Sequence, residues 1–462
     1  MIAENRTAAN RQEEETDAES CLITRLEAEL GPLPERLDAY VDTRLVSTFM
    51  ELMTAIITFV HPKQGLQVAK LGAVLKNGAQ APAGTKKIER LLHSKKWSAD
   101  LVKVFLWEKA TQKVKELQRR EEQVLCIHDG SRLEKPESEQ TSGLCTVLSS
   151  KAKRLRKIRK GVWNPPMGKP ITVLGLEWTG VIVVGMQGAP QVAAMEYWSR
   201  KGEKATTGQE VEKRLLWKSL CTLGRGVWHV FDRGYASKAW LELWSALKVD
   251  FVTRWQGRHH FLDEDGNEKP LWKFACWKKS WGYREIEDPK TKKWVRTGVV
   301  AVPVRHTGYA GQLWLVVGRG KGDPWYLVTN QPIETEEDAW RIVMAYARRW
   351  KIEESFRFEK SELGVESVCL QSWEAREKLL QMVTLLYTYL LSLCGEDAEW
   401  LRNWLLRHHC HRTGKRLRQV KMPLYRIRWA LADLWQKTNL LPQVARLLRA
   451  SPLSNVCSQS SG

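Results

Sequence analysis

Closely spaced cysteine pairs are missing from this sequence. The chain has 462 residues and nine cysteines, which are scattered and include no CxxC spacing. A disulfide framework or a zinc ribbon would require cysteines at short, regular separations. The cysteine usage therefore argues against both kinds of site and fits a reducing cytosol.

Long hydrophobic runs and a hydrophobic start are missing as well. The longest uncharged apolar run, Leu379 to Cys394, has 16 residues and contains Gln and Thr. A membrane-spanning helix needs about 20 predominantly apolar residues. The acidic, polar first residues are unlike a secretory signal peptide. We expect a buried helix at this run, no membrane partner and a cytoplasmic location.

Acidic residues are fewer than basic ones. There are 73 Lys and Arg residues against 53 Asp and Glu, a net charge of +20. The first 20 residues hold two cations and six acids, which is −4, so the other 442 residues carry +24. Neutralising phosphates with such a chain releases condensed counterions, so a polyanion is favoured as partner, most simply a nucleic acid. The alternative is a basic protein without such a partner.

Composition and periodicity divide the chain into six segments, because 462 residues exceed one compact core. The acidic start is expected to be disordered. Helical patterns come first and last, and strands dominate the middle. We expect a tail at 1–20, a helical DNA-binding domain at 21–115, an α/β core at 116–255 and 331–370, an antiparallel β insertion subdomain at 256–330, and a helical, dimerising C-terminal domain at 371–462.

The central region has the order of elements of a ribonuclease-H-like α/β core. It begins with the apolar run 123–131, followed by PITVLGLEW and VIVVGMQ, which we interpret as a hairpin with a Thr-Gly turn. A helix over 208–221, a strand ending at Asp232, a helix over 237–247 and the strand DFVTRW come next. This order predicts a mixed five-stranded sheet with helices.

Three acids occupy positions suited to metal chemistry. Asp129 and Asp232 each end an apolar strand just before a glycine-containing turn, and the two strands are neighbours in such a sheet. Glu353 lies on one long helix that we expect from Thr335 to about Leu363. Converging carboxylates repel one another, and two divalent cations relieve the repulsion while activating water or a 3′-hydroxyl for phosphoryl transfer. Each Asp alone could instead be a turn or cap residue.

A helical wheel separates the three glutamates of the stretch YARRWKIEESFRFEK. At about 100° per residue, Arg349, Glu353 and Lys360 continue an apolar, core-facing stripe. Glu354 lies to one side, and Glu359 is expected to point away from the core. A carboxylate on a core-facing stripe must be paired or bind a metal. A structural Arg349–Glu353 pair at i,i+4 remains an alternative.

These residues resemble the signature of the DDE transposases of bacterial cut-and-paste elements in the insertion-sequence-four group. The family signature Tyr-x2-Arg-x3-Glu-x6-Lys is matched by Tyr346, Arg349, Glu353 and Lys360. The family's Asp-Arg pair followed by Gly and an aromatic residue is matched at 232–235, and its first Asp at Asp129. Gly130 departs from the Thr that often follows this Asp. The resemblance covers roughly residues 120–370.

The resemblance implies two Mg²⁺ (or Mn²⁺) ions per active site, held by Asp129, Asp232 and Glu353. It also implies nicking by water, attack by the new 3′-hydroxyl on the opposite strand, and a hairpin end with one base flipped out. An aromatic ring can hold such a base, and Trp325 resembles that residue, although core packing is its alternative. The implied DNA contacts are Arg233, Arg254, Trp325, Tyr346, Arg349 and Lys360.

A basic segment after a Gly/Pro turn, GTKKIERLLHSKKW, is a candidate for DNA recognition. A recognition helix needs cations on its exposed side, but a solvated helix face has the same composition. The candidate residues are Lys86, Lys87, Arg90, Lys95 and Lys96.

The combined prediction is a transposase that binds the terminal inverted repeats of its element in double-stranded DNA. It would pair two ends as a homodimer, cleave them with two metal ions and join them to target DNA, in the bacterial cytoplasm at the nucleoid. Two alternatives stay open. One is a domesticated metal-dependent nuclease, and the other is a catalytically silent DNA-binding repressor, which would need no cluster of three acids.

Overall fold

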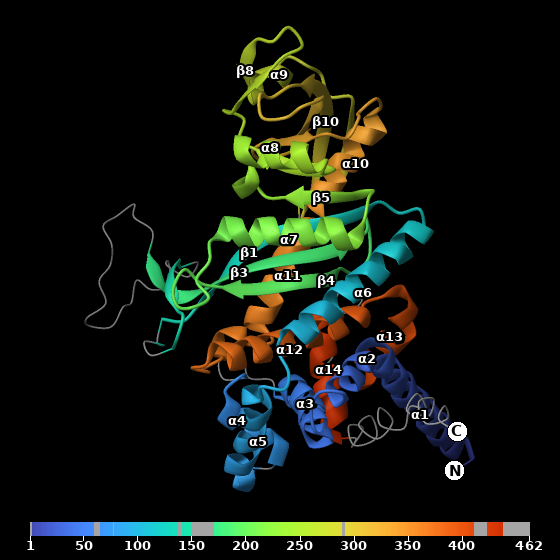
Figure 1. The fold of residues 1–462 in the computed structure, drawn as a ribbon. Coiled ribbons are helices and arrows are strands. Elements are labelled where there is room, and N and C mark those ends of the chain that lie inside the picture. The colour runs from blue at the N-terminus through green and yellow to red at the C-terminus, as the bar shows by residue number, and fades with distance from the viewer. Residues whose placement is uncertain are drawn as a thin grey trace, which may run out of the picture.

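The computed structural model describes residues 2–59, 65–76, 78–136, 138, 141–149, 171–288, 292–410 and 423–437. Strands and covering helices form the middle and upper part of the molecule in Figure 1, and a group of helices forms the lower part. A ten-stranded mixed sheet has the order β2-β3-β1-β5-β6-β12-β11-β10-β9, with β4 also paired to β3. The sheet carries the residues discussed below.

Five of these strands form the ribonuclease-H-like core that the sequence predicts. Strands β1, β3 and β4 are antiparallel neighbours, while β5 pairs parallel to β1 and β6 parallel to β5. The resulting order is β4-β3-β1-β5-β6. The bounds are β1 (Val124–Glu134), β2 (Cys145–Leu148), β3 (Thr172–Val184), β4 (Gln191–Trp198), β5 (Val227–Phe231) and β6 (Phe251–Trp255). The predicted fold class is therefore confirmed.

Two local predictions in this core are wrong. The expected hairpin with its Thr-Gly turn is a single strand, β3, because Thr179 and Gly180 pair with both β1 and β4. Gly180 also lies against Phe356, where a Cβ atom would come within 2.9 Å of the ring. The expected turn after Asp129 is likewise absent, because β1 continues to Glu134. In both places a glycine belongs to a paired strand rather than to a turn.

Helices cover both faces of the core sheet. One face, with Cys126, Val181 and Val183, packs on α6 (Asp100–Arg119) and α7 (Gly208–Leu223). The other face, with Leu125 and Ile127, shares a core with α10 (Glu336–Ala347), α11 (Trp350–Ser361) and α12 (Trp373–Ser392). Helix α8 (Lys238–Leu247) connects β5 to β6.

The segment predicted as one helix from Thr335 is two helices. Thr335 caps α10 through a capping box with Asp338, as its sequence suggests. A turn at Arg348 and Arg349 then separates α10 from α11. Arg348 is held there by the backbone carbonyls of Gly185 and Gly188. The helical wheel drawn through this turn is therefore not continuous.

The β insertion extends the core sheet. Strand β12 pairs antiparallel with β6, and β11, β10 and β9 follow in antiparallel order. Its elements are β7 (His260–Leu262), β8 (Glu268–Pro270), α9 (Leu271–Ala275), β9 (Gly282–Glu287), β10 (Trp294–Val304), β11 (Leu313–Arg319) and β12 (Trp325–Thr329). The strands are antiparallel as expected, but β9 to β12 share the sheet of the core.

The N-terminal and C-terminal helices pack together around α12. Helices α3 and α5 contact α12, and α3 also contacts α14. The N-terminal helices are α1 (Ile2–Leu30), α2 (Pro32–Asp38), α3 (Thr43–Thr58), α4 (Val68–Lys76) and α5 (Ala81–His93). The C-terminal ones are α13 (Glu399–His408) and α14 (Leu424–Lys437), and short 3-10 turns lie at 78–80, 233–235, 365–367 and 396–398.

The acidic start is helical rather than disordered. Helix α1 includes most of the predicted tail, since Ala, Glu and Arg are good helix formers. Its C-terminal half is fixed by Leu22, Leu26 and Leu30, which are buried in the main core. The helix is therefore anchored in the core through its C-terminal half.

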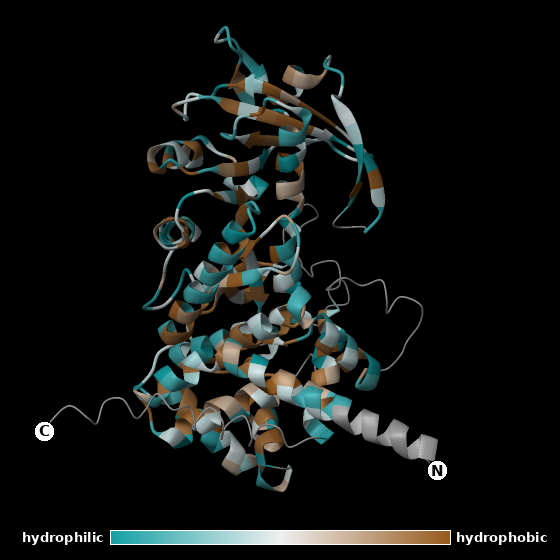
Figure 2. Cartoon of the chain, turned by 90° about the vertical axis from the view of Figure 1, so that its right-hand side faces the viewer, coloured by the Kyte–Doolittle hydropathy of each residue, from teal (hydrophilic) through white to brown (hydrophobic). Residues whose placement is uncertain are grey.

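The apolar run in α12 is a buried helix, as predicted. Figure 2 shows the hydropathy of each residue along the ribbon. Among the described residues, no single helix passes the length and hydropathy criteria for crossing a membrane. Only the pair 373–392 and 396–408 passes them jointly, and its two helices are bent by 78°.

Candidate active site

Two of the predicted acids are brought together by the parallel pair β1 and β5. The register runs from Val124 opposite Val227 to His128 opposite Phe231. Asp129 and Asp232 are the next residues on the two strands, so they lie at the same end. Because strand side chains alternate, Asp129 points to the face opposite His128, which is the face covered by α11.

The third acid reaches this place from α11, with Arg349 between the acids. The Arg349 Nη1 atom donates to Asp129 Oδ2 at 2.9 Å, and Nη2 donates to Glu353 Oε1 at 2.6 Å. The Arg349 side chain is only 6% exposed, compared with 35% for Glu353. The alternative considered above, an i,i+4 pair between Arg349 and Glu353, is thus present, and it includes Asp129 as a second partner.

The electrostatics of Asp129 show that the three acids repel one another. The pKa of Asp129 is raised to about 7, mainly by burial and also by Asp232 and Glu353, while Arg349 and the Gly130 N–H oppose the rise. The guanidinium thus compensates only part of the cost of placing a carboxylate here. An added cation at this place would be stabilised.

The donor set fits a hard divalent ion, since Mg²⁺ and Mn²⁺ prefer carboxylate oxygens. Arg349 would compete with such an ion for the oxygens of Asp129 and Glu353. Among the described residues, the one group whose three ligand atoms lie within 4.8 Å of one another is a different cluster, Cys126, His128 and His229. The oxygens of Asp129, Asp232 and Glu353 are therefore not all within this distance of one another, and Arg349 lies between Asp129 and Glu353.

The remaining signature residues line the same region. Tyr346 ends α10, is buried, and its ring lies 5.3 Å from that of Trp325 in an edge-on contact. Burial raises the pKa of Tyr346, and the nearby charges of Arg349, Asp232 and Arg254 also act on it. Trp325 and Arg254 are therefore close to the acids, on the neighbouring strands β12 and β6.

Lys360 and Arg233 lie at the edges of the site. The Lys360 ammonium donates to Ser131 Oγ at 2.7 Å, two residues beyond Asp129 on β1. Arg233 is exposed in the turn that directly follows Asp232. The sequence analysis did not identify Ser131. Because strand side chains alternate, Ser131 lies on the same side of the sheet as Asp129, which is two residues earlier in β1.

The predicted N-terminal cations lie on α5 and just after it. Lys86, Arg90, Lys95 and Lys96 are exposed, but Lys87 is paired with Glu51 of α3, with 2.6 Å between Nζ and Oε2. Helix α5 crosses α4 at two glycines, where a Cβ on Gly84 would lie 2.1 Å from the carbonyl oxygen of Gly72. This crossing fixes which side of α5 faces outward.

The side chain of Glu359 does not point in the predicted direction. Glu359, expected to point away from the core, has no exposed surface and contacts Thr384 of α12 at 3.3 Å and Tyr197 of β4 at 3.5 Å. Burial raises its pKa to about 8. The wheel failed here because it considered a single core face, while α12 buries the other side of α11. The flanking Phe356 and Phe358 were the available signal.

Comparison with known proteins assigns part of the chain. Residues 203–389 match the family model "Transposase DDE domain". This match supports a DDE transposase family. The matched segment contains Asp232, Glu353 and the whole Tyr-Arg-Glu-Lys signature, and Asp129 lies before it. No curated protein matches the chain.

Among solved structures, the chain is similar to one described as "Cryo-EM structure of piggyBac transposase synaptic complex with hairpin DNA". The two are 10% identical, and the match covers 89% of this chain and 74% of that one with a TM-score of 0.38. At this identity and score the likeness carries no argument about function.

Proposed function

We propose that this chain is a DNA transposase whose catalytic acids are Asp129, Asp232 and Glu353. The observation that carries the proposal is the convergence of acids from two neighbouring parallel strands and from α11 around one buried arginine. The match to the transposase DDE domain supports the reaction class. The expected reaction is cleavage of DNA at the ends of a mobile element, followed by transfer of the 3′ ends to target DNA.

The three acids would hold two Mg²⁺ or Mn²⁺ ions, which supply Lewis-acid activation of the attacking oxygen and stabilise the leaving oxygen when bound. The contribution of this chain is to place the carboxylates on two strands and a helix that are rigidly packed. Arg349 neutralises part of the charge of Asp129 and Glu353. The family resemblance implies that its guanidinium would also contact a phosphate of the DNA.

DNA would lie along Arg233, Arg254, Tyr346 and Lys360, with Trp325 available to hold a flipped base. The half-buried Trp325 ring already contacts Tyr346 edge-on. Stacking on an aromatic ring contributes roughly 1–3 kcal/mol per base. This arrangement supports a hairpin intermediate and the finer resemblance to the insertion-sequence-four group.

An exposed aromatic and basic segment offers a further DNA contact on the insertion. WKFACWKKSW (272–281) has three tryptophans and three lysines but no acid. Trp277 is 95% exposed, and Lys278 and Lys279 beside it are exposed too. Arg319 holds the segment by donating to the carbonyls of Ala275 and Lys278. Tryptophans among lysines are suited to a nucleic acid, because rings stack on bases while ammonium groups neutralise phosphates.

The partners we propose are double-stranded DNA at the element ends and at the target, and a second copy of this chain in the complex that pairs two ends. The exposed cations of α5, Lys86 and Arg90, would contribute to recognition of the ends, together with Lys95 and Lys96. Since the substrate is DNA, the expected place of action is the bacterial cytoplasm at the nucleoid.

The decisive experiment uses a labelled element-end duplex with Mg²⁺ and the Asp232→Asn variant. Binding of the duplex should survive, because the variant keeps size and fold, while nicking should disappear. Asp250→Asn, at an acid outside the site, is the matched control and should nick normally. Nicking by Asp232→Asn at the wild-type rate would contradict the assignment of the acids.

A domesticated nuclease is the second candidate, since the same acids would serve it. The DNA that flanks the gene separates the two. Terminal inverted repeats bounded by a short target duplication support a mobile element, and their absence supports domestication. If the protein were a catalytically silent repressor, the wild-type chain would bind the element ends but never nick them.

A further inference from the structure

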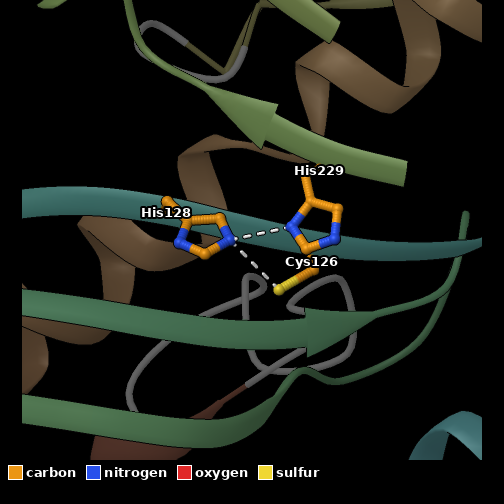
Figure 3. A group of neighbouring side chains, drawn as sticks. All are labelled: Cys126, His128 and His229. Carbon is orange, nitrogen blue, oxygen red and sulfur yellow. Dashed lines mark hydrogen bonds between the residues drawn. The ribbon is translucent and has the colours of Figure 1, made fainter. Parts of the chain in front are cut away.

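A second cluster of ligand-type side chains lies on the opposite face of β1 and β5 from the acids (Figure 3). Cys126 and His128 project from the same face of β1, and His229 is the partner of Cys126 in the register with β5. The Cys126 Sγ atom lies 3.3 Å from His128 Nε2, which lies 3.1 Å from His229 Nδ1. We propose that these three residues bind one structural Zn²⁺ ion.

The distances suit such an ion. Zn–N bonds of about 2.0–2.1 Å and Zn–S bonds of about 2.3 Å place neighbouring ligand atoms of a tetrahedral site roughly 3.3–3.6 Å apart. The two measured separations are within a few tenths of an ångström of this, and all three atoms lie within 4.8 Å of one another. A shift of the side chains alone would complete the geometry.

The donors also select the ion. A thiolate and two imidazoles favour zinc, whereas the all-carboxylate set around Arg349 favours Mg²⁺ or Mn²⁺. The two faces of β1 therefore offer two chemically different metal sites. The zinc proposal does not rest on the proposed transposase activity, because none of its ligands is one of the acids.

The surroundings are those of a closed, structural site. His128 and His229 are buried, and Phe231 stacks on His128 with 4.9 Å between ring centroids. Zn²⁺ binding would displace the Cys126 thiol proton to solvent as the Zn–S bond forms. Ser219 of α7 hydrogen-bonds to Cys126.

The site has a structural consequence for the acids. His128 immediately precedes Asp129, and His229 stands three residues before Asp232. An ion that bridges β1 and β5 at these positions fixes the register of the two strands. From the opposite face of the sheet, the zinc would thus keep the two catalytic aspartates next to each other.

The alternative is a metal-free core in which one neutral imidazole donates an N–H to the other. Zinc content decides between them. Full-length protein is produced with zinc supplied, dialysed against buffer with excess Mg²⁺, and its zinc is measured by plasma mass spectrometry. We expect about one zinc per chain in the wild type. Two control variants should keep the same zinc content: Asp232→Asn, and Cys221→Ser at an exposed cysteine of α7. Cys126→Ser and His229→Ala should each lose most of it.

Cobalt substitution is the second measurement, and it does not depend on the variants folding. Co²⁺ in the wild type should give a thiolate-to-cobalt charge-transfer band and intense visible bands of a four-coordinate site, unchanged in Cys221→Ser. Wild-type protein with no zinc and no thiolate band overturns the proposal. Zinc content in folded Cys126→Ser equal to that in wild type overturns it as well.

Discussion

Arg349 and Asp129 form a buried ion pair in the middle of the candidate active site. Their Nη1 and Oδ2 atoms are 2.9 Å apart, and the side chains are only 6% and 14% exposed. The same guanidinium binds Glu353. Arg349 therefore occupies a position where the positive charge of a metal ion would also be stabilised. The effect of removing Arg349 on stability should therefore depend on whether metal is present.

Substitution of Arg349 tests this coupling. In the absence of divalent metal, Arg349→Ala should lower the free energy of unfolding by about 3–5 kcal/mol, because it leaves a buried carboxylate without its partner. Saturating Mg²⁺ should restore part of this loss, since the ion replaces the missing charge. Urea denaturation with and without Mg²⁺ measures both effects. Arg341→Ala, at an exposed pair with Asp338, should change stability by about 0.5 kcal/mol or less in either buffer. A loss that Mg²⁺ does not reduce would show that the ion does not bind these acids.

Glu359 should make stability depend on pH. Burial raises its folded-state pKa from the ordinary value of 4.5 to about 8. The folded chain therefore keeps the proton while the unfolded chain has lost it, so this group lowers stability progressively as pH rises from about 4.5 to 8. Glu359→Gln should remove that slope and stabilise the protein above pH 8 by an amount on the order of 1–3 kcal/mol. Thermal unfolding from pH 5 to 9 checks it. Equal slopes for variant and wild type would mean that Glu359 is ionised in the fold.

Trp325 should separate the two strand-cleavage steps. Trp325→Ala removes the ring that would hold a flipped base, so hairpin formation should fall by roughly 5- to 150-fold, as expected from about 1–3 kcal/mol of stacking. First-strand nicking should continue, and Trp325→Phe should recover most hairpin formation. Gel analysis of labelled ends measures both products. Trp217→Ala, at an exposed tryptophan of α7, serves as the control. Unchanged hairpin yield in folded Trp325→Ala would leave Trp325 as a packing residue only.

The exposed segment at 272–281 should contribute to affinity for DNA. Trp277→Ala combined with Lys278→Ala and Lys279→Ala should weaken binding and reduce the dependence of log Kd on log salt by roughly two counterions. Fluorescence anisotropy at several salt concentrations, in the Asp232→Asn background, gives both quantities. A triple variant that binds as tightly as its parent, while the wild type cleaves DNA, would remove this segment from the DNA surface without affecting the proposed reaction.

The crossing of α4 and α5 should depend on glycine. In Gly84→Ala the added Cβ would lie 2.1 Å from the Gly72 carbonyl oxygen, so the helices must separate, with an expected loss of about 1–3 kcal/mol. Gly78→Ala is the matched control, because a Cβ there meets nothing within 4 Å. Chemical denaturation gives the stability. The exposed cations of α5 would shift with the helix, so Gly84→Ala should also bind element ends more weakly than Gly78→Ala.

The α/β character of the core, the cation excess and the spacing of Tyr346, Arg349, Glu353 and Lys360 could be read from the sequence. These features are local, or repeat along one element, and they led to a ribonuclease-H-like core with three acids. Strand β4 could not be read, because both halves of the predicted hairpin belong to β3. The ends of individual elements could not be read, because glycines at 130 and 180 suggested turns that strand pairing overrides.

The relationships between distant residues were decided only by tertiary structure. The wheel placed Arg349 and Glu353 on one side, but Asp129, as a second partner of the guanidinium, comes from a strand 220 residues away in the chain. Glu359 became a core residue because α12 packs on the far side of α11. The Cys126, His128 and His229 cluster exists because β1 and β5 are paired in one register. The sequence by itself determined which groups were available for chemistry, while packing and strand register decided which of them meet, since burial and charge pairing depend on neighbours that no local pattern contains.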